Sequence, residues 1–160
     1  MSTVSADGVT NAAPYSFFNV FSHHPALVVL GIERRGATVQ KDTGRNIELG
    51  NEFVVNLVNE EIVAGMNDCA IDFPPEISEI ELAGFTLAPS TKVTPPRIAE
   101  APAALECRRF VTLQPGHGRE LVIGEILAIH IRDGIVDPTT VSYTHLCQGL
   151  LPRSARPAGG

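Results

Sequence analysis

Runs of apolar residues divide the chain into a set of strands. Ala26–Arg34 and Glu52–Val58 are apolar at almost every position, which is typical of strands that are buried on both faces or closed into a barrel. Ala104–Leu113, which also contains charged residues, and Glu120–Arg132 complete the set of expected strands. Gly124 interrupts the last of these runs, and a glycine there predicts a bulge or a sharp bend in the strand.

Shorter elements fill the rest of the chain. Thr3–Pro14 is expected to form two short strands, because Asp7-Gly8 between them is a strong signal for a tight hairpin. Asn59 is expected to cap a helix that begins at Glu60, and Ser78 to open another that ends at Gly84. Strands linked by hairpins, with only a few short helices, predict an antiparallel barrel that is mainly β or α+β.

Composition excludes several classes of protein. A single domain is expected at 160 residues, and a net charge of −6 argues against binding nucleic acid or an anionic membrane. The three cysteines are odd in number and lack C-x-x-C spacing, so we expect neither a disulfide framework nor a metal site. The apolar run Ala26–Ile32 is too short to span a membrane, and the N-terminus lacks a signal-peptide pattern. The expected location is the cytoplasm.

A loop with unusual chemistry precedes Asn46-Ile47. One of the two lysines of the chain, Lys41, is followed by Asp42 and Thr43 at the start of a short helical pattern. The first N–H groups of a helix favour an anion, and Lys41 and Arg45 would add positive charge beside them. Asp42 or Thr43 is the expected N-cap. The loop therefore fits a phosphate, although an ordinary capped surface helix would account for the same residues.

The segment between Asn11 and Leu30 is rich in rings and polar groups. Four of the nine Phe and Tyr residues lie within seven positions, from Tyr15 to Phe21, and alternate with Ser16, Asn19 and Ser22. Such a mixture suits a planar, hydrogen-bonding heteroaromatic ligand, with donors around its edge and rings against its face. An aromatic core strand with its polar residues turned outward is the other interpretation.

Together these stretches resemble the flavin reductase-like family, whose domain is an FMN-binding split barrel. The matching pieces are TVSADGVTNAAPYSFFNVFSHHPALVVLGI, KDTGRNIELGNEFVVNLV, the segment from Met66 to Pro102, LECR and GEILAIHIRDGIVD. The combination of N-x-A-P-Y-S-F-F, K-D-T-x-x-N-I and G-E-x-x-x-x-H carries the resemblance. It implies a six-stranded antiparallel Greek-key barrel over residues 1–138, followed by a tail over residues 139–160, and a homodimer with FMN near the interface.

The resemblance also implies site residues. It places the flavin ring against Asn11, Tyr15, Ser16, Phe17, Asn19 and Ser22, and the FMN phosphate against Lys41, Asp42, Thr43 and Asn46. Lys92 matches a basic position that reaches toward the flavin from the proline-rich loop, and His130 matches a histidine after the G-E pair; these two are the candidate catalytic residues. From the sequence alone, Lys92 could equally be an exposed loop lysine and His130 a polar residue facing solvent.

The implied activity is that of an FMN-dependent oxidoreductase, in which NADH or NADPH reduces the flavin and the reduced flavin passes to an acceptor. A monooxygenase that receives reduced flavin is a possible partner by family analogy. Two alternatives remain open: an electron-transfer module that carries flavin without nicotinamide turnover, and a non-catalytic dimeric barrel that only binds a ligand.

Overall fold

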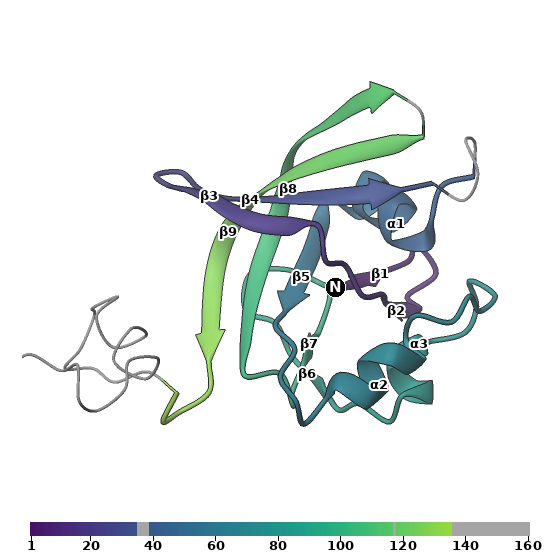
Figure 1. Cartoon of the computed structure of the whole chain (residues 1–160), viewed down its shortest axis with the longest axis vertical. Coiled ribbons are helices and arrows are strands. Elements are labelled where there is room, and N and C mark those ends of the chain that lie inside the picture. Colours follow the sequence, from purple (N-terminus) through teal and green to yellow (C-terminus); the bar gives the residue numbers. More distant parts are fainter. Residues whose placement is uncertain (35–38, 117, 136–160) are drawn as a thin grey trace, which may run out of the picture.

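Antiparallel strands dominate the computed structural model, which describes residues 1–34, 39–116 and 118–135 (Figure 1). Three short helices lie among them. The strands are β1 (Ser2–Val4), β2 (Thr10–Ala12), β3 (Phe18–His23), β4 (Ala26–Glu33), β5 (Glu52–Asn56), β6 (Leu87–Ala88), β7 (Arg97–Ile98), β8 (Ala103–Gly116) and β9 (Arg119–Ile131). The helices are α1 (Asp42–Gly50), α2 (Val63–Asp68) and α3 (Glu79–Leu82).

Seven strands form one sheet in the order β2-β1-β5-β8-β9-β4-β3, and β6 pairs with β7 in a second, two-stranded sheet. Every recorded pairing is antiparallel. The mainly β, antiparallel class is therefore confirmed, whereas the expected count of six strands is wrong for the part of the chain described. The additional strand is β3. The sequence did not mark it as a strand, because it carries polar residues between its rings and lacks the apolar run that marked the others.

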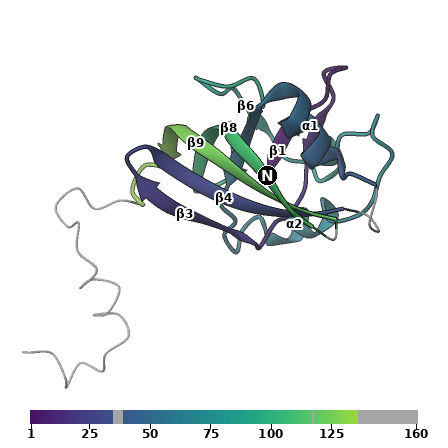
Figure 2. The same ribbon diagram turned by 90° about the horizontal axis from the view of Figure 1, so that it is seen from above.

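The sheet curls around a core drawn from its inner face (Figures 1 and 2). In β4, Val28, Leu30 and Ile32 point into this core, and the residues between them are half-buried on the outer face. Phe53 of β5 and Val122 of β9 complete the centre, and α1 closes it with Ile47. Burying these side chains contributes about 1.5–3 kcal/mol each, which is the main source of stability.

Gly124 marks a close approach as well as a bulge. A Cβ atom at this position would lie 2.5 Å from Cζ of Phe53, so only glycine lets the ring pack flat against β9. The register between β8 and β9 also shifts between Arg109 and Val111, opposite Gly124. The extra residue of this bulge, Phe110, lies on β8, so the irregularity is beside Gly124 but in the partner strand and not in the strand for which it was predicted.

Two helices begin at other residues than their capping signals suggest, α1 earlier and α2 later, whereas α3 has the expected N-cap, Ser78. The first residue of α1 is Asp42, and its N-cap is Lys41, which makes no side-chain capping bond. The expected cap at Asp42 or Thr43 is therefore wrong. The carboxylate of Asp42 instead accepts a hydrogen bond of 3.0 Å from Arg45. Likewise α2 begins at Val63 rather than Glu60.

Some predictions fall on residues outside the described part of the chain. These are the tail over 139–160 and, within it, Cys147, one of the three cysteines. Within the described ranges, no helix is both long and apolar enough to cross a membrane, and no cluster of His, Cys, Asp or Glu has the arrangement of a metal site.

Candidate functional site

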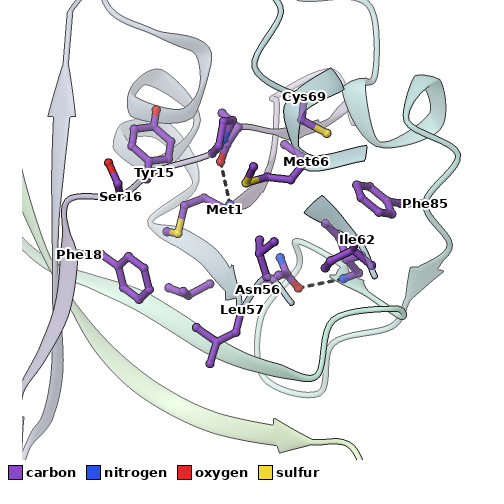
Figure 3. A pocket seen from close by; sticks show the side chains of 16 residues that line it. Met1, Tyr15, Ser16, Phe18, Asn56, Leu57, Ile62, Met66, Cys69 and Phe85 are labelled. Carbon is purple, nitrogen blue, oxygen red and sulfur yellow. Dashed lines mark hydrogen bonds between the residues drawn. The ribbon is translucent and has the colours of Figure 1, made fainter. Parts of the chain in front are cut away.

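A cavity of about 640 Å³ opens between the segment that leads into β3 and helix α2. Figure 3 shows Tyr15, Ser16 and Phe18 on one side and Met66 and Phe85 on the other. The floor comes from the end of β5 and the residues after it. The lining is mostly apolar, and the volume lies within the range of about 300–1,000 Å³ that is typical of small-molecule sites. We call this space the large cavity.

A second cavity, of about 200 Å³, lies at the start of α1. It shares Ala13, Pro14, Tyr15 and Cys69 with the large cavity, so the two lie next to each other. Its other lining residues include Asn11, Lys41, Asp42, Thr43, Asp72 and Glu79. We call it the small cavity. The structure therefore brings together the N-terminal ring-rich segment and the K-D-T loop.

Asn11 is the centre of a buried hydrogen-bond network behind the small cavity. Its Oδ1 accepts the hydroxyls of Thr3 (3.2 Å) and Thr43 (3.1 Å). Its Nδ2 donates to both carboxylate oxygens of Glu79, at 2.9 and 3.0 Å. The network is completed by Asn46, whose Nδ2 donates to Thr3 Oγ1 at 3.1 Å. It joins β1, β2, α1 and α3 through side chains alone.

This network changes the interpretation of the predicted phosphate residues. Thr43 is 1% exposed and Asn46 is 3% exposed, and each donates inward to the network rather than toward a ligand. Lys41, Asp42 and Thr43 all line the small cavity at this end, and Lys41 is the cation among them. A direct contact from Thr43 or Asn46 to a phosphate stays a prediction, and the described geometry gives both residues a supporting role.

The charge of the small cavity is mixed. Among its described lining residues, Lys41 is the single cation, whereas Asp42, Asp72 and Glu79 carry carboxylates. Burial raises the pKa of Glu79 above its usual range; the Asp42 carboxylate acts in the same direction, and hydrogen bonds from Ala12 N and Asn11 oppose it. Burial also raises the pKa of Cys69 to about 11, with Glu79 adding to the effect, so this thiol stays protonated and unreactive.

The ring-rich segment divides between the cavity and the surface. Tyr15, Ser16 and Phe18 line the large cavity, as the prediction for Tyr15 and Ser16 requires. Phe17 is 71% exposed and points away from the core. Asn19 and Ser22 lie further along β3 and line neither cavity, and Asn19 Oδ1 accepts the N–H of the next residue at 2.8 Å.

His130 and Lys92 come together at another place, around Glu106. This carboxylate is fully buried in β8 and accepts the backbone N–H groups of Thr91 (2.8 Å) and Lys92 (2.6 Å). His130 Nε2 lies 2.5 Å from Glu106 Oε1. Burial opposes ionisation of Glu106, but these hydrogen bonds together outweigh it and lower its pKa. In the described chain His130 is thus a partner of Glu106 and not an exposed residue, and neither it nor Lys92 lines a cavity.

The sequence did not single out four residues that matter here. Met66 and Phe85 form the far wall of the large cavity, and Glu79 and Glu106 anchor the two networks. A charged residue between Leu105 and Cys107, in the middle of an apolar strand, was a usable signal for Glu106, because a buried carboxylate needs several partners. Met66 and Phe85 carried no comparable signal, because an apolar residue that lines a cavity cannot be distinguished in the sequence from an ordinary core residue.

The structure is a mainly β barrel with two adjacent cavities, which are the candidate ligand site, beside its N-terminal hairpin. The chain belongs to the flavin reductase like domain family, whose model matches residues 1–149. A 2-nitrobenzoate 2-nitroreductase from Pseudomonas fluorescens is 39% identical, with a TM-score of 0.76 over 85% of this chain and 64% of that one. Component B of a nitrilotriacetate monooxygenase from Bacillus cereus is 32% identical, with a TM-score of 0.80 over 86% and 70%.

A flavin reductase from Shewanella frigidimarina with a split barrel domain has a TM-score of 0.79 at 22% identity, over 86% of this chain and 68% of that one. It supports the fold alone, which is a split barrel. The chain is shorter than several relatives. It spans 69% of an uncharacterized protein from Aquifex aeolicus, at 39% identity, and 55% of one from Deinococcus radiodurans, at 40% identity.

Proposed function

We propose that this protein is an FMN-dependent oxidoreductase of the NAD(P)H:flavin reductase type. The observation that supports the proposal is that two cavities lie next to each other and share lining residues, one mostly apolar and lined by rings, the other with Lys41 at a helix start. A flavin mononucleotide has the same two parts, a planar ring and a charged phosphate. Family membership supplies the flavin, and the lining residues are chemically suited to it.

We expect different residues to bind the ring and the phosphate of the flavin. Tyr15 and Phe18 supply ring faces, and Ser16 supplies polar groups at the mouth of the large cavity. Lys41 and the first turn of α1 supply positive potential for the phosphate. Met66 and Phe85 exclude water from the far wall. When bound, the flavin would accept a hydride from the nicotinamide and pass electrons on, and the protein's part is to hold and orient it.

The test is to purify the chain, titrate it with FMN, and follow NADH and NADPH oxidation with and without added flavin. Binding together with nicotinamide oxidation supports the proposal. FMN binding without nicotinamide oxidation would assign the chain to the electron-transfer alternative. A chain that neither turns yellow nor quenches FMN fluorescence would leave only the non-catalytic barrel. A monooxygenase that consumes the reduced flavin is the proposed acceptor, to be tested by coupling the two proteins.

Lys41→Ala is expected to weaken FMN binding about tenfold, because a charged contact to phosphate is lost. Riboflavin, which lacks the phosphate, should bind both proteins equally. Thr43→Ala is the matched variant: it removes a buried hydroxyl from Asn11 Oδ1 and should lower the free energy of unfolding by about 1 kcal/mol with little effect on affinity. Fluorescence titration and urea unfolding measure the two effects. Equal FMN affinity of the Lys41 variant and the parent would remove Lys41 from the site.

We also propose that two copies pair through the outer face of the sheet. One row of apolar residues crosses β8, β9, β4 and the residue before β3 on this face. We call it the outer apolar row; it consists of Leu113, Leu121, Gly31 and Phe17. Val111, Ile123 and Val29 form a parallel row beside it. A continuous apolar strip of this kind on a sheet face is typical of a protein interface. Its proximity to Ser16 fits the family-implied flavin site near the interface.

Leu113→Asp is expected to convert the dimer to a monomer, because a carboxylate in the outer apolar row would lose its water on pairing. Leu49→Asp is the control, since Leu49 is similarly exposed, at 64%, but lies on α1 away from the row. Light scattering coupled to size-exclusion chromatography measures the mass. A parent protein that already runs as a monomer would contradict the pairing.

A further inference from the structure

Glu79 is a nearly buried carboxylate in the wall of the cavity that we assign to the phosphate. It is 7% exposed and comes from the start of α3, and it faces the small cavity together with Lys41 and Thr43. A dianion entering this space would meet one described cation and three described carboxylates. Like charges repel most strongly beside a buried carboxylate, so loss of the charge of Glu79 would favour a phosphate in this cavity.

We propose that binding of the flavin phosphate is coupled to the uptake of one proton by Glu79. The inference rests on the proposed function, because it needs the phosphate to lie in the small cavity. The proton comes from solvent and adds to one carboxylate oxygen. The resulting O–H can donate to a phosphate oxygen, so a repulsive neighbour becomes a hydrogen-bond donor.

The hydrogen bonds of Glu79 indicate which oxygen takes the proton. Oε2 accepts two donors, Asn11 Nδ2 at 3.0 Å and Ala12 N at 3.2 Å. Oε1 accepts Asn11 Nδ2 at 2.9 Å, and the carboxylate also accepts the backbone N–H of Glu79 itself. Protonation at Oε1 therefore leaves Oε2 as the acceptor for both donors, and the anchoring of β2 survives the change.

The groups around Glu79 favour it over its neighbours. Asp42, on α1, lies close enough to raise its pKa and is itself paired with Arg45. Cys69, after α2, is a protonated thiol, and the Met1 amino group donates to Ala13 O at 2.8 Å. Asp72, on the loop before α3, lines the cavity but is exposed to solvent. Of the three carboxylates, Glu79 is the most buried.

Affinities measured between about pH 5.5 and 8.5 test the coupling. For the parent protein, the Kd of FMN should rise with pH by up to about tenfold per pH unit, as expected for one linked proton. Riboflavin should lack this dependence. Because FMN phosphate itself titrates near a pKa of about 6, Glu79→Gln is the essential comparison: it should retain only the phosphate's own dependence. Asp72→Asn is the matched control, since it removes one charge from the same cavity but should keep the parent's slope.

Isothermal titration in buffers of different ionisation heat counts the protons directly and does not depend on a variant. FMN should take up about one more proton than riboflavin on binding to the parent protein. Equal proton counts for the two ligands, or equal slopes for the parent and a folded Glu79→Gln variant, would overturn the coupling while leaving the flavin site intact. Failure to bind either flavin would instead overturn the proposed function, and the coupling with it.

Discussion

Glu106→Ala is expected to lower the free energy of unfolding by about 3–5 kcal/mol, the largest effect predicted for a single substitution in this protein. The carboxylate is fully buried, and its removal leaves the N–H groups of Thr91 and Lys92 without an acceptor and His130 without its partner. Urea unfolding followed by circular dichroism measures the loss. A loss below about 1 kcal/mol would show that the loop over β8 does not depend on this carboxylate.

Glu52→Ala is the control for this loop. Glu52 accepts the N–H of Thr94 at 2.7 Å from the neighbouring strand, but its side chain is 21% exposed, so water can replace it. We expect a loss of about 1 kcal/mol. Comparing the two losses in the free energy of unfolding separates the contribution of a buried carboxylate from that of a single contact to the loop.

The stabilisation by Glu106 should also depend on pH. Because the pKa of Glu106 is lowered in the folded protein, its charged form stabilises the fold above the unfolded value of about 4.5, and this contribution is lost as the pH falls through the folded pKa. The gap in stability between the parent and Glu106→Gln should therefore narrow in acid. A gap that stays constant from neutral pH down to about pH 3 would contradict the role of the charge.

Gly124→Ala is expected to destabilise the protein by about 3 kcal/mol, which is the second large effect. The added Cβ would lie 2.5 Å from Cζ and 2.8 Å from Cε1 of Phe53. The ring is fully buried in the core and has no free space to move into, so the strand and the surrounding core must shift to relieve the contact. Thermal and urea unfolding of the variant give the measurement.

Gly31→Ala is the matched substitution in the adjacent strand. Its Cβ would meet Phe17 Cβ at 3.2 Å, and Phe17 lies on the exposed outer face, where a shift of a few tenths of an ångström is cheap. We expect a loss of less than about 1 kcal/mol. Similar losses at both glycines would mean that the backbone conformation, and not the contact with Phe53, explains the effect at Gly124.

The strands were predictable where burial leaves a simple pattern. The hairpin at Asp7-Gly8 and the long strands β4, β5, β8 and β9 follow from apolar runs and turn residues. Strand β3 was not predicted, because at the edge of the sheet its pattern mixes rings with polar residues. The start of α2 was misjudged because Asn59 reads as a cap, yet its side-chain amide donates to Glu61 instead.

The sequence predicted which segments form the candidate site, but not which side chains contact one another there. The sequence and the family resemblance brought Tyr15 and Lys41 to one place, and the two cavities join them. The direction of Thr43 could not be read from the sequence, because it depends on Asn11, which lies 32 positions away in the chain. The partners of Glu106 are similarly distant, at Thr91 and His130, so only the three-dimensional fold reveals them.

The position of Asn11 has a consequence for motion. Its side-chain amide, on β2, is hydrogen-bonded to side chains of β1, α1 and α3. None of these elements can detach without breaking a hydrogen bond of Asn11. Such a group of elements opens as a cooperative unit in native-state hydrogen exchange. The elements that form the wall of the small cavity should therefore unfold together. The backbone amides of Thr3 and Ile80, although far apart in the sequence, should exchange with the same opening rate.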